Sequence, residues 1–377
     1  MTSTSTSPEG VTPRALEGWQ FVQMVLADLT ARVTAEAETE LELFDGLRML
    51  ARVAALCSEL TVDADRERPW FFPMNTPLRY VGGPNPDGAY HLCSIDGTRR
   101  YRLTGQRGTC RYLGFQVLAG RGLDSRRMTG YVSDRDLAVA EGGRFALVLS
   151  NSEPSADELD GATWVAIPED ASAVVVRQYV ADAADETLAT YDIEPLRDPG
   201  PPAAATDDEL GAAFTAMGWT IARLATLHEL APMKEAMANP NQFFSYHAAQ
   251  LGFENSTPDN LYVLGSWRLG PDDALVVETT PPQTRFWNLV AETIWHECID
   301  YRRRASSVTD ATAVRHADGA VRLVLASRDP GVPNWVDVGG RHRGFMTFRW
   351  IDNPAPPELT TMVMPVDEVA RLDGGAA

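Results

Sequence analysis

The sequence predicts an α+β fold that is mainly β, with two related jelly-roll-like β-sandwich modules, an N-terminal helical hairpin and a helical linker between the modules. Three observations predict it: apolar residues at helical spacing near the start, short β-branched runs at regular spacing after them, and a weak internal repeat. The 377 residues suffice for about two domains of ordinary size.

Four regions are expected along the chain. They are an N-terminal helical region (1–65), a first β-sandwich module that is a degenerate copy (66–198), a linker with helices (199–260) and a second β-sandwich module (261–377).

The helical hairpin is predicted from two apolar stripes. Leu16, Trp19 and Val22 begin the first stripe at spacings of a helix, and a second runs from Leu41 to Cys57. The residues from Glu36 to Glu42 are rich in acid, so we expect a solvated acidic corner between two helices.

The linker region is marked by composition. A Pro- and Ala-rich segment follows Asp198, and Thr206 with Glu209 then forms the pattern of a capping box at a helix start. A further helical or irregular stretch is expected from Met233 to Leu251.

An internal duplication is the most informative feature of the β-rich regions. Five elements recur in the same order at offsets between 171 and 176 residues. They include a strand that begins with Arg111 in one copy and Arg285 in the other, and a later Arg-aromatic strand, 174–179 and 345–350. The repeat predicts two related sandwiches.

The second copy resembles the DUF1214 family. The residues that carry the resemblance are the segment 281–287, Asp318-Gly319, Asn334-Trp335 and the segment 348–350. The resemblance implies a jelly-roll-like β-sandwich, often paired in relatives with a DUF1254 domain, but it implies no reaction and no catalytic residues. The first copy departs from the pattern, because Thr163 stands where the family has Asn before Trp.

Composition excludes several classes of function. With 33 Lys+Arg against 52 Asp+Glu, the net charge of −19 disfavours binding to nucleic acid or to an anionic membrane. No apolar stretch is long enough to span a membrane, and no secretory signal is recognisable. The four cysteines lack CxxC spacing, which indicates reduced thiols and a cytoplasmic location. Neither a dinucleotide fingerprint nor a phosphate loop occurs, so no cofactor is expected.

The segment 286–304 contains the densest set of chemically active side chains. We expect His296, Asp300 and Glu297 to be catalytic, as an acid–base set. In a strand His296 and Asp300 would share a face, and in a helix they would be neighbours one turn apart. The alternative is a structural network in which Asp300 pairs with the arginines at 302–304.

Substrate contacts are expected from aromatic and polar residues in irregular segments: Phe244, Tyr246, His247, Tyr262 and Tyr301. The alternative is that these side chains only seal the core between helices and sheets. No metal is expected, because the pairs His228-Glu229 and His296-Glu297 lack the spacing of an HExxH site.

Two functions remain. The first is a cofactor-free enzyme, a lyase, isomerase or hydrolase, that uses His/carboxylate acid–base chemistry on a small, largely apolar molecule such as a terpenoid, steroid or acyl derivative. The second is a non-catalytic lipid- or glycan-binding or accessory protein. The expected partner is a small-molecule ligand, and the sequence leaves open whether the chain forms a homo-oligomer.

Overall fold

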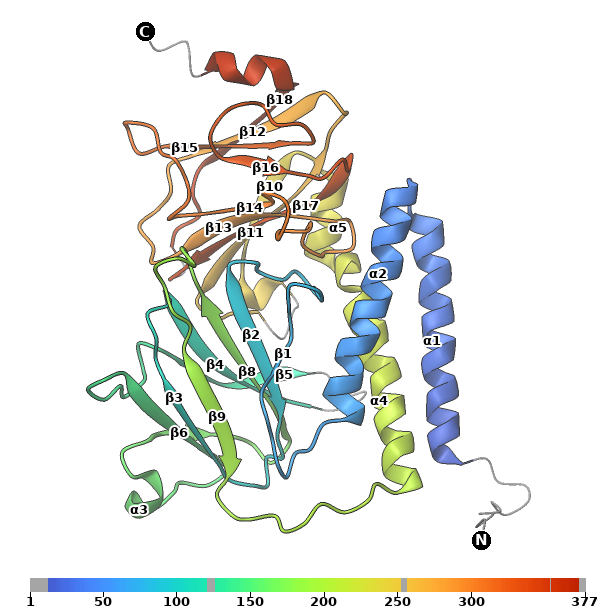
Figure 1. Ribbon diagram of the computed structural model, residues 1–377, viewed down its shortest axis with the longest axis vertical. Coiled ribbons are helices and arrows are strands. Elements are labelled where there is room, and N and C mark those ends of the chain that lie inside the picture. The colour runs from blue at the N-terminus through green and yellow to red at the C-terminus, as the bar shows by residue number, and fades with distance from the viewer. Residues whose placement is uncertain (1–12, 121–125, 252–255, 353, 373–377) are drawn as a thin grey trace.

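The computed structural model describes residues 13–120, 126–251, 256–352 and 354–372 (Figure 1). The α-helices are α1 (Arg14–Glu36), α2 (Glu40–Cys57), α3 (Ala156–Leu159), α4 (Asp207–Ala225) and α5 (Ala231–Ala238). Shorter helical turns are the π-helical η1 (Ser58–Val62) and the 3-10 turns η2 (Leu227–Glu229), η3 (Ala248–Gln250) and η4 (Val366–Leu372).

The first sandwich contains β1 (Phe72–Pro73), β2 (Gly88–Ser94), β3 (Tyr101–Gln106), β4 (Tyr112–Ala119), β5 (Arg127–Ser133), β6 (Arg144–Ser150), β7 (Thr163–Ala166), β8 (Ala171–Tyr179) and β9 (Thr190–Pro195). One sheet has the order β1-β2-β8-β4-β5 and the other β7-β6-β3-β9. Leu103 and Leu147 from one sheet pack against Phe115 and Val174 from the other, and burial of these apolar faces stabilises the module.

The second sandwich contains β10 (Gln242–His247), β11 (Asn260–Arg268), β12 (Asp273–Thr279), β13 (Trp287–Glu292), β14 (Ser307–Thr309), β15 (Val321–Ala326), β16 (Trp335–Asp337), β17 (Arg343–Ile351) and β18 (Leu359–Pro365). Its sheets have the orders β10-β11-β17-β13-β14 and β16-β15-β12-β18. The core between them includes Leu275, Leu289, Leu323 and Phe348.

The two sandwiches are built alike. Each strand of the first has an equivalent in the second, from β1 and β10 to β9 and β18, and the sheet orders correspond strand by strand. Even the parallel pair recurs, as β6 with β7 and β15 with β16. The predicted fold class and the internal duplication are therefore confirmed.

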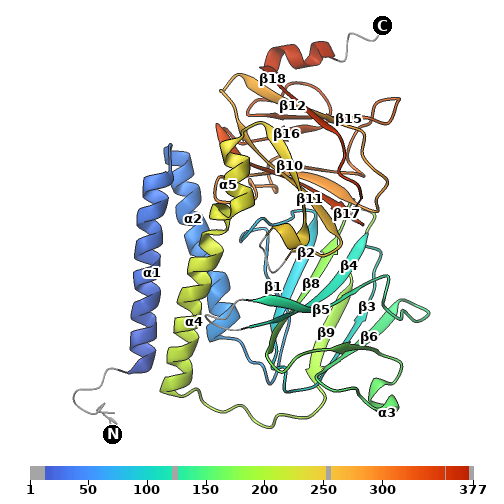
Figure 2. The same ribbon diagram turned by 180° about the vertical axis from the view of Figure 1, so that it is seen from behind.

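Helices α1, α2 and α4 lie side by side along one side of both sandwiches (Figures 1 and 2). A Cβ on Gly18 would lie 2.6 Å from the carbonyl oxygen of Gly211, so the glycines let the backbones of α1 and α4 approach closely. Thr206 and Glu209 form the predicted capping box at the start of α4. The predicted hairpin is confirmed as α1 and α2.

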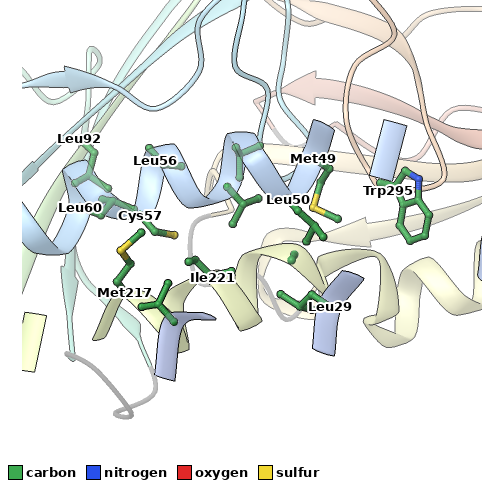
Figure 3. Packing of buried hydrophobic residues seen from close by; sticks show 14 of the residues in the cluster. Leu29, Met49, Leu50, Leu56, Cys57, Leu60, Leu92, Met217, Ile221 and Trp295 are labelled. Atoms are coloured by element: carbon green, nitrogen blue, oxygen red, sulfur yellow. The ribbon is translucent and has the colours of Figure 1, made fainter. Parts of the chain in front are cut away.

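The helices share one core with both sandwiches. Figure 3 shows Leu56 of α2 and Ile221 of α4 in this core, with Leu92 of the first sandwich and Trp295, which follows β13 of the second. The indole of Trp295 donates a 2.8 Å hydrogen bond to the carbonyl oxygen of Glu42. The helical layer therefore fixes the two sandwiches relative to each other.

Two expectations were wrong. The acidic corner is not solvated throughout: Glu42 is 2% exposed, and Arg343 of β17 contacts it at 2.8 Å. The stretch from Met233 to Leu251 is not only helical or irregular, because β10 lies within it and forms an edge strand of the second sandwich. That sandwich therefore begins before residue 261.

Candidate functional site

A cavity of about 110 Å³ lies where the two sandwiches meet the helices. Its walls come from α2 and α4, from β2 and β8 of the first sandwich, from β11 and β17 of the second, and from connecting segments such as 81–84 and the turn at His296. The larger apolar side chains on the walls include Leu56, Val81, Leu224, Leu227, Leu251 and Leu264. The polar ones include Tyr90, Arg177, Tyr262, His296, Thr347 and Arg349.

Two equivalent Tyr–Arg pairs face this cavity. Tyr90 of β2 lies directly opposite Arg177 of β8, and Tyr262 of β11 lies directly opposite Arg349 of β17. The two tyrosines and the two arginines are each 172 residues apart in the sequence. The duplication thus contributes the same cross-strand pair twice to one site.

Arg349 is almost completely buried, with 3% of its surface exposed. Its Nη2 donates to the carbonyl oxygen of Gly83 at 2.7 Å and lies 3.7 Å from Oε1 of Glu292, whereas its buried Nη1 has no hydrogen-bond partner among the described residues. Burial opposes the charge, but Tyr90 and Glu292 outweigh it and raise the pKa of Arg349 above its ordinary value. The guanidinium is a fixed positive charge in the site.

Arg177 is buried to a similar degree and donates to the side-chain oxygen of Gln116. Its guanidinium lies 5.9 Å from the ring centre of Tyr90. Burial raises the pKa of the Tyr90 hydroxyl well above its usual value, so the phenol is neutral at physiological pH.

His296 lies in a tight turn after β13. The amide of His296 donates to the carbonyl of Thr293, and the backbone of His296 is left-handed at φ 58°. This turn brings Nδ1 of the imidazole to 2.5 Å from Oε2 of Glu292. Burial would raise the pKa of Glu292, but His296 and then Arg349 lower it below its ordinary value, so the pair is charge-assisted.

The expected pairing of His296 with Asp300 is corrected by the structure. Asp300 instead lies 3.4 Å from Arg302 and 3.6 Å from Arg303, which is the structural network given as the alternative. The segment is neither a continuous strand nor a helix, because the turn at 293–296 changes its direction. The carboxylate partner of His296 is therefore Glu292.

Glu297 and Tyr301 follow the turn at 293–296 in the sequence, and neither is among the described residues that line the cavity. The side chain of Glu297 is 1% exposed and 2.7 Å from Nη1 of Arg52. The ring of Tyr301 packs against Tyr80, with 5.5 Å between centroids. Glu297 therefore contacts Arg52 and Tyr301 packs against Tyr80, both outside the described cavity lining.

Of the expected substrate contacts, Tyr262 lines the cavity. Phe244, Tyr246 and His247 belong to the edge strand β10, and none of them is among the described lining residues. The hydroxyl of Tyr246 donates to Glu235 of α5, and His247 is exposed. Tyr246 packs against α5, as the core-sealing alternative has it, whereas the exposed His247 seals no core.

The histidines considered for a metal site are dispersed. Nε2 of His228 lies 3.3 Å from Glu36, and these two residues with Glu229 form a group whose ligand atoms lie within 4.8 Å of one another. Arg32 lies 3.5 Å from Glu229, so the group takes part in surface ion pairs between α1 and η2. His296 does not belong to this group, because its Nδ1 pairs with Glu292 at the cavity.

Sequence reasoning missed Arg177, Arg349, Tyr90 and Glu292. The sequence did contain a signal for the two arginines, because the repeated Arg-aromatic strands 174–179 and 345–350 include Arg177 and Arg349. An arginine at the centre of an otherwise apolar strand, repeated in both copies, indicates a buried charge with a specific role.

Gly83→Ala should disturb His296 directly. A Cβ on Gly83 would lie 2.1 Å from Nε2 of His296, and the backbone of Gly83 is left-handed at φ 61°. We expect a stability loss of about 1–3 kcal/mol and a displaced imidazole, measured by denaturant unfolding and by the NMR signals of the His296 ring. Gly142→Ala is the control, because its backbone is also left-handed but nothing lies within 4 Å of its Cβ. Equal losses in the two variants would contradict the close contact.

The fold and this cavity define a tandem β-sandwich protein with a small site between its duplicated halves. Residues 273–355 match the family described as "Protein of unknown function (DUF1214)", which confirms the resemblance for this part of the chain. None of the curated proteins matches the sequence.

A solved structure shares the architecture. The crystal structure of an uncharacterised protein from Burkholderia cenocepacia is similar with a TM-score of 0.87 and 27% identity, over 94% of this chain and 99% of that chain. The VPA0106 protein from Vibrio parahaemolyticus matches with a TM-score of 0.48 and 11% identity, over 84% of this chain and 98% of that chain. No helix in the described part of the chain is long and apolar enough to cross a lipid bilayer.

Proposed function

We propose that this protein is a cofactor-free acid–base enzyme, a lyase, isomerase or hydrolase, that acts on a small acyl compound in the cavity between its sandwiches. The observation that carries the proposal is the contact between His296 and Glu292, 2.5 Å apart, at the wall of that cavity. Its cytoplasmic location stays a prediction of the sequence, which leaves its oligomeric state open.

The pair has the arrangement that proton transfer requires. A carboxylate on Nδ1 fixes the orientation of the imidazole and stabilises its protonated form, while the ring remains at the cavity wall. Glu292 is completely buried, so water does not compete for this hydrogen bond. Such a pair can take a proton from a bound substrate and return it.

The size of the cavity favours the acyl derivative among the expected substrates. An apolar cavity of about 150 Å³ holds a benzene molecule. At about 110 Å³, the described cavity matches a short acyl chain better than a terpenoid or a steroid. Its leucine side chains suit a short hydrocarbon chain.

A second candidate is a non-catalytic binding protein. The observation that favours it is the pair of buried arginines, because Arg177 and Arg349 can hold a ligand without any proton transfer. The two candidates differ in whether His296 is needed for turnover or only for affinity.

The experiment incubates the protein with a pool of short acyl compounds in D2O and, separately, in ¹⁸O-water. NMR would detect deuterium incorporated next to a carbonyl, and mass spectrometry would detect ¹⁸O from hydrolysis. We expect His296→Gln to lower the rate by about 10²- to 10⁴-fold. The control is His91→Gln, because His91 also forms a hydrogen bond, at 2.6 Å to Tyr191, but does not line the cavity. Equal rates for wild type and His296→Gln would contradict the enzyme, and binding without turnover would support the second candidate.

A further inference from the structure

We propose that the cavity binds the carboxylate group of a small organic acid between Arg177 and Arg349, the equivalent arginines of the two sandwiches. The proposal rests on the proposed function for the reaction that follows, and it names the substrate class: a short-chain carboxylate rather than a neutral acyl compound.

The charge of the cavity is the first observation. Among the described residues that line it, Arg177, Arg223 and Arg349 are cationic, and none is Asp or Glu. The chain as a whole has a net charge of −19, so this concentration of positive charge runs against its composition. A cationic pocket in an acidic protein selects an anion locally rather than attracting anions to the whole surface.

The state of Arg349 is the second observation. Its buried Nη1 has no hydrogen-bond partner among the described residues, and its nearest carboxylate, Glu292, lies 3.7 Å from Nη2 and also holds His296. A buried donor without a partner is costly, and a charged one more so. An anionic ligand would complete its hydrogen bonding.

The convergence of the two halves is the third observation. Tyr90, Arg177, Tyr262 and Arg349 all line the one cavity, although they come from different sandwiches. The charge of Arg349 in the second sandwich acts on the hydroxyl of Tyr90 in the first, and it lowers the pKa of that phenol against the larger effect of burial. The two Tyr–Arg pairs therefore face one cavity and influence each other electrostatically.

The chemistry of these side chains indicates the ligand. A guanidinium presents paired N–H groups that match the two oxygens of a carboxylate, or those of a phosphate. The small volume and the leucines nearby leave room for a short hydrocarbon chain beside the anionic group. The carboxylate fits this mixture of charge and apolar surface, and inorganic phosphate is the comparison that tests it.

Isothermal titration calorimetry on the full chain tests the proposal with four probes: butyrate, succinate, inorganic phosphate and butyramide, the neutral counterpart of butyrate. We expect a carboxylate to bind and butyramide to bind at least about tenfold more weakly. Arg349→Gln and Arg177→Gln should each weaken carboxylate binding by about 10- to 100-fold and leave the amide unaffected. The control is Arg135→Gln, because Arg135 is 57% exposed and pairs with Asp352 away from the cavity lining.

Circular dichroism and thermal unfolding establish whether each variant folds. If Arg349→Gln does not fold, Arg349→Lys replaces it, because lysine keeps the buried charge and loses the planar paired donors. The expected result for Arg349→Lys is a several-fold weaker affinity for the carboxylate, with no change for butyramide.

Several results would overturn the proposal: equal affinities for butyrate and butyramide, no binding of either carboxylate, or unchanged affinity in a folded Arg349 variant. Tighter binding of phosphate than of both carboxylates would show that the carboxylate is the wrong ligand. Arg349-dependent carboxylate binding without turnover would leave this proposal standing and refute the enzyme. Turnover of neutral compounds alone would refute carboxylate binding and leave the proposed enzyme standing.

Discussion

Raising the pH from about 4.5 to about 8 should destabilise the folded protein through Glu297, and Glu297→Gln should remove this contribution. Burial raises the pKa of Glu297 to about 8, and the neighbouring Asp45 adds to it, although Arg52 acts in the opposite direction from 2.7 Å. Oε1 of the carboxylate has no hydrogen-bond partner among the described residues, which agrees with an incompletely compensated charge.

The direction of this pH effect follows from the linkage between proton binding and folding. The folded state holds its proton up to about pH 8, whereas the unfolded chain releases it near pH 4.5, so the stabilisation is complete below pH 4.5 and is lost as the pH rises through 8. Each pKa unit corresponds to about 1.4 kcal/mol, so the contribution amounts to several kcal/mol.

The measurement is the free energy of unfolding by denaturant at a series of pH values between 4 and 9, chosen to span this interval. Glu297→Gln should become more stable relative to wild type as the pH rises. Glu153→Gln is the control, because Glu153 is exposed. Parallel pH profiles for wild type and Glu297→Gln would show that the ion pair with Arg52 outweighs burial.

Glu292→Gln should destabilise the protein by about 3–5 kcal/mol at neutral pH, because it removes the counter-charge of buried groups. Glu292 is completely buried, holds Nδ1 of His296 at 2.5 Å and lies 3.7 Å from Arg349. The amide keeps the shape of the side chain and loses the charge, so the charge of Arg349 is left in the interior without this compensation and His296 loses its carboxylate partner.

Unfolding by denaturant measures this loss against Glu278→Gln. Glu278 is also a strand glutamate paired with an arginine, Arg322 at 2.7 Å, but its side chain is 48% exposed, so its loss should cost at most about 1 kcal/mol. Equal losses of stability in Glu292→Gln and Glu278→Gln would mean that Glu292 is not a net stabilising charge.

The stabilising effect of Glu292 also depends on pH. The pKa of Glu292 is below its ordinary value of 4.5, so its stabilising effect is present above that pH and lost as the pH falls through the folded pKa.

The elements of the fold could largely be predicted because their signals are local. The apolar spacing and the capping box of Thr206 with Glu209 each act within one or two turns of helix, and helix α1 and the capping box were confirmed. The buried side of α1 begins at Val22, because Leu16 and Trp19 are exposed. The duplication was also visible, because equivalent strands keep the same order and type of residue. The strand β10 was missed because its residues, such as Phe244 and Tyr246, lie on a half-exposed edge without a clear apolar alternation.

The candidate site could be predicted only in part. His296 and Tyr262 were found from residue type, but the partner of His296 was wrong because spacing arguments assume one regular geometry through the segment. The left-handed backbone of His296 breaks that geometry and turns the ring back onto Glu292, four residues earlier. Asp300 is carried past the turn to the arginines at 302 and 303.

The amino-acid pattern alone specifies the helices, the strands, their repetition and the acidic net charge, since each depends on near neighbours or on composition. The packing of the two sandwiches and the helices creates the cavity, and it brings Tyr90 and Arg177 to the same space as Tyr262 and Arg349. Equivalent residues that are 172 positions apart in the sequence thus line one cavity, and their arrangement depends on burial in the complete fold. For that reason the arginines could be recognised as a repeat in the sequence, but their meeting in one site required the tertiary structure.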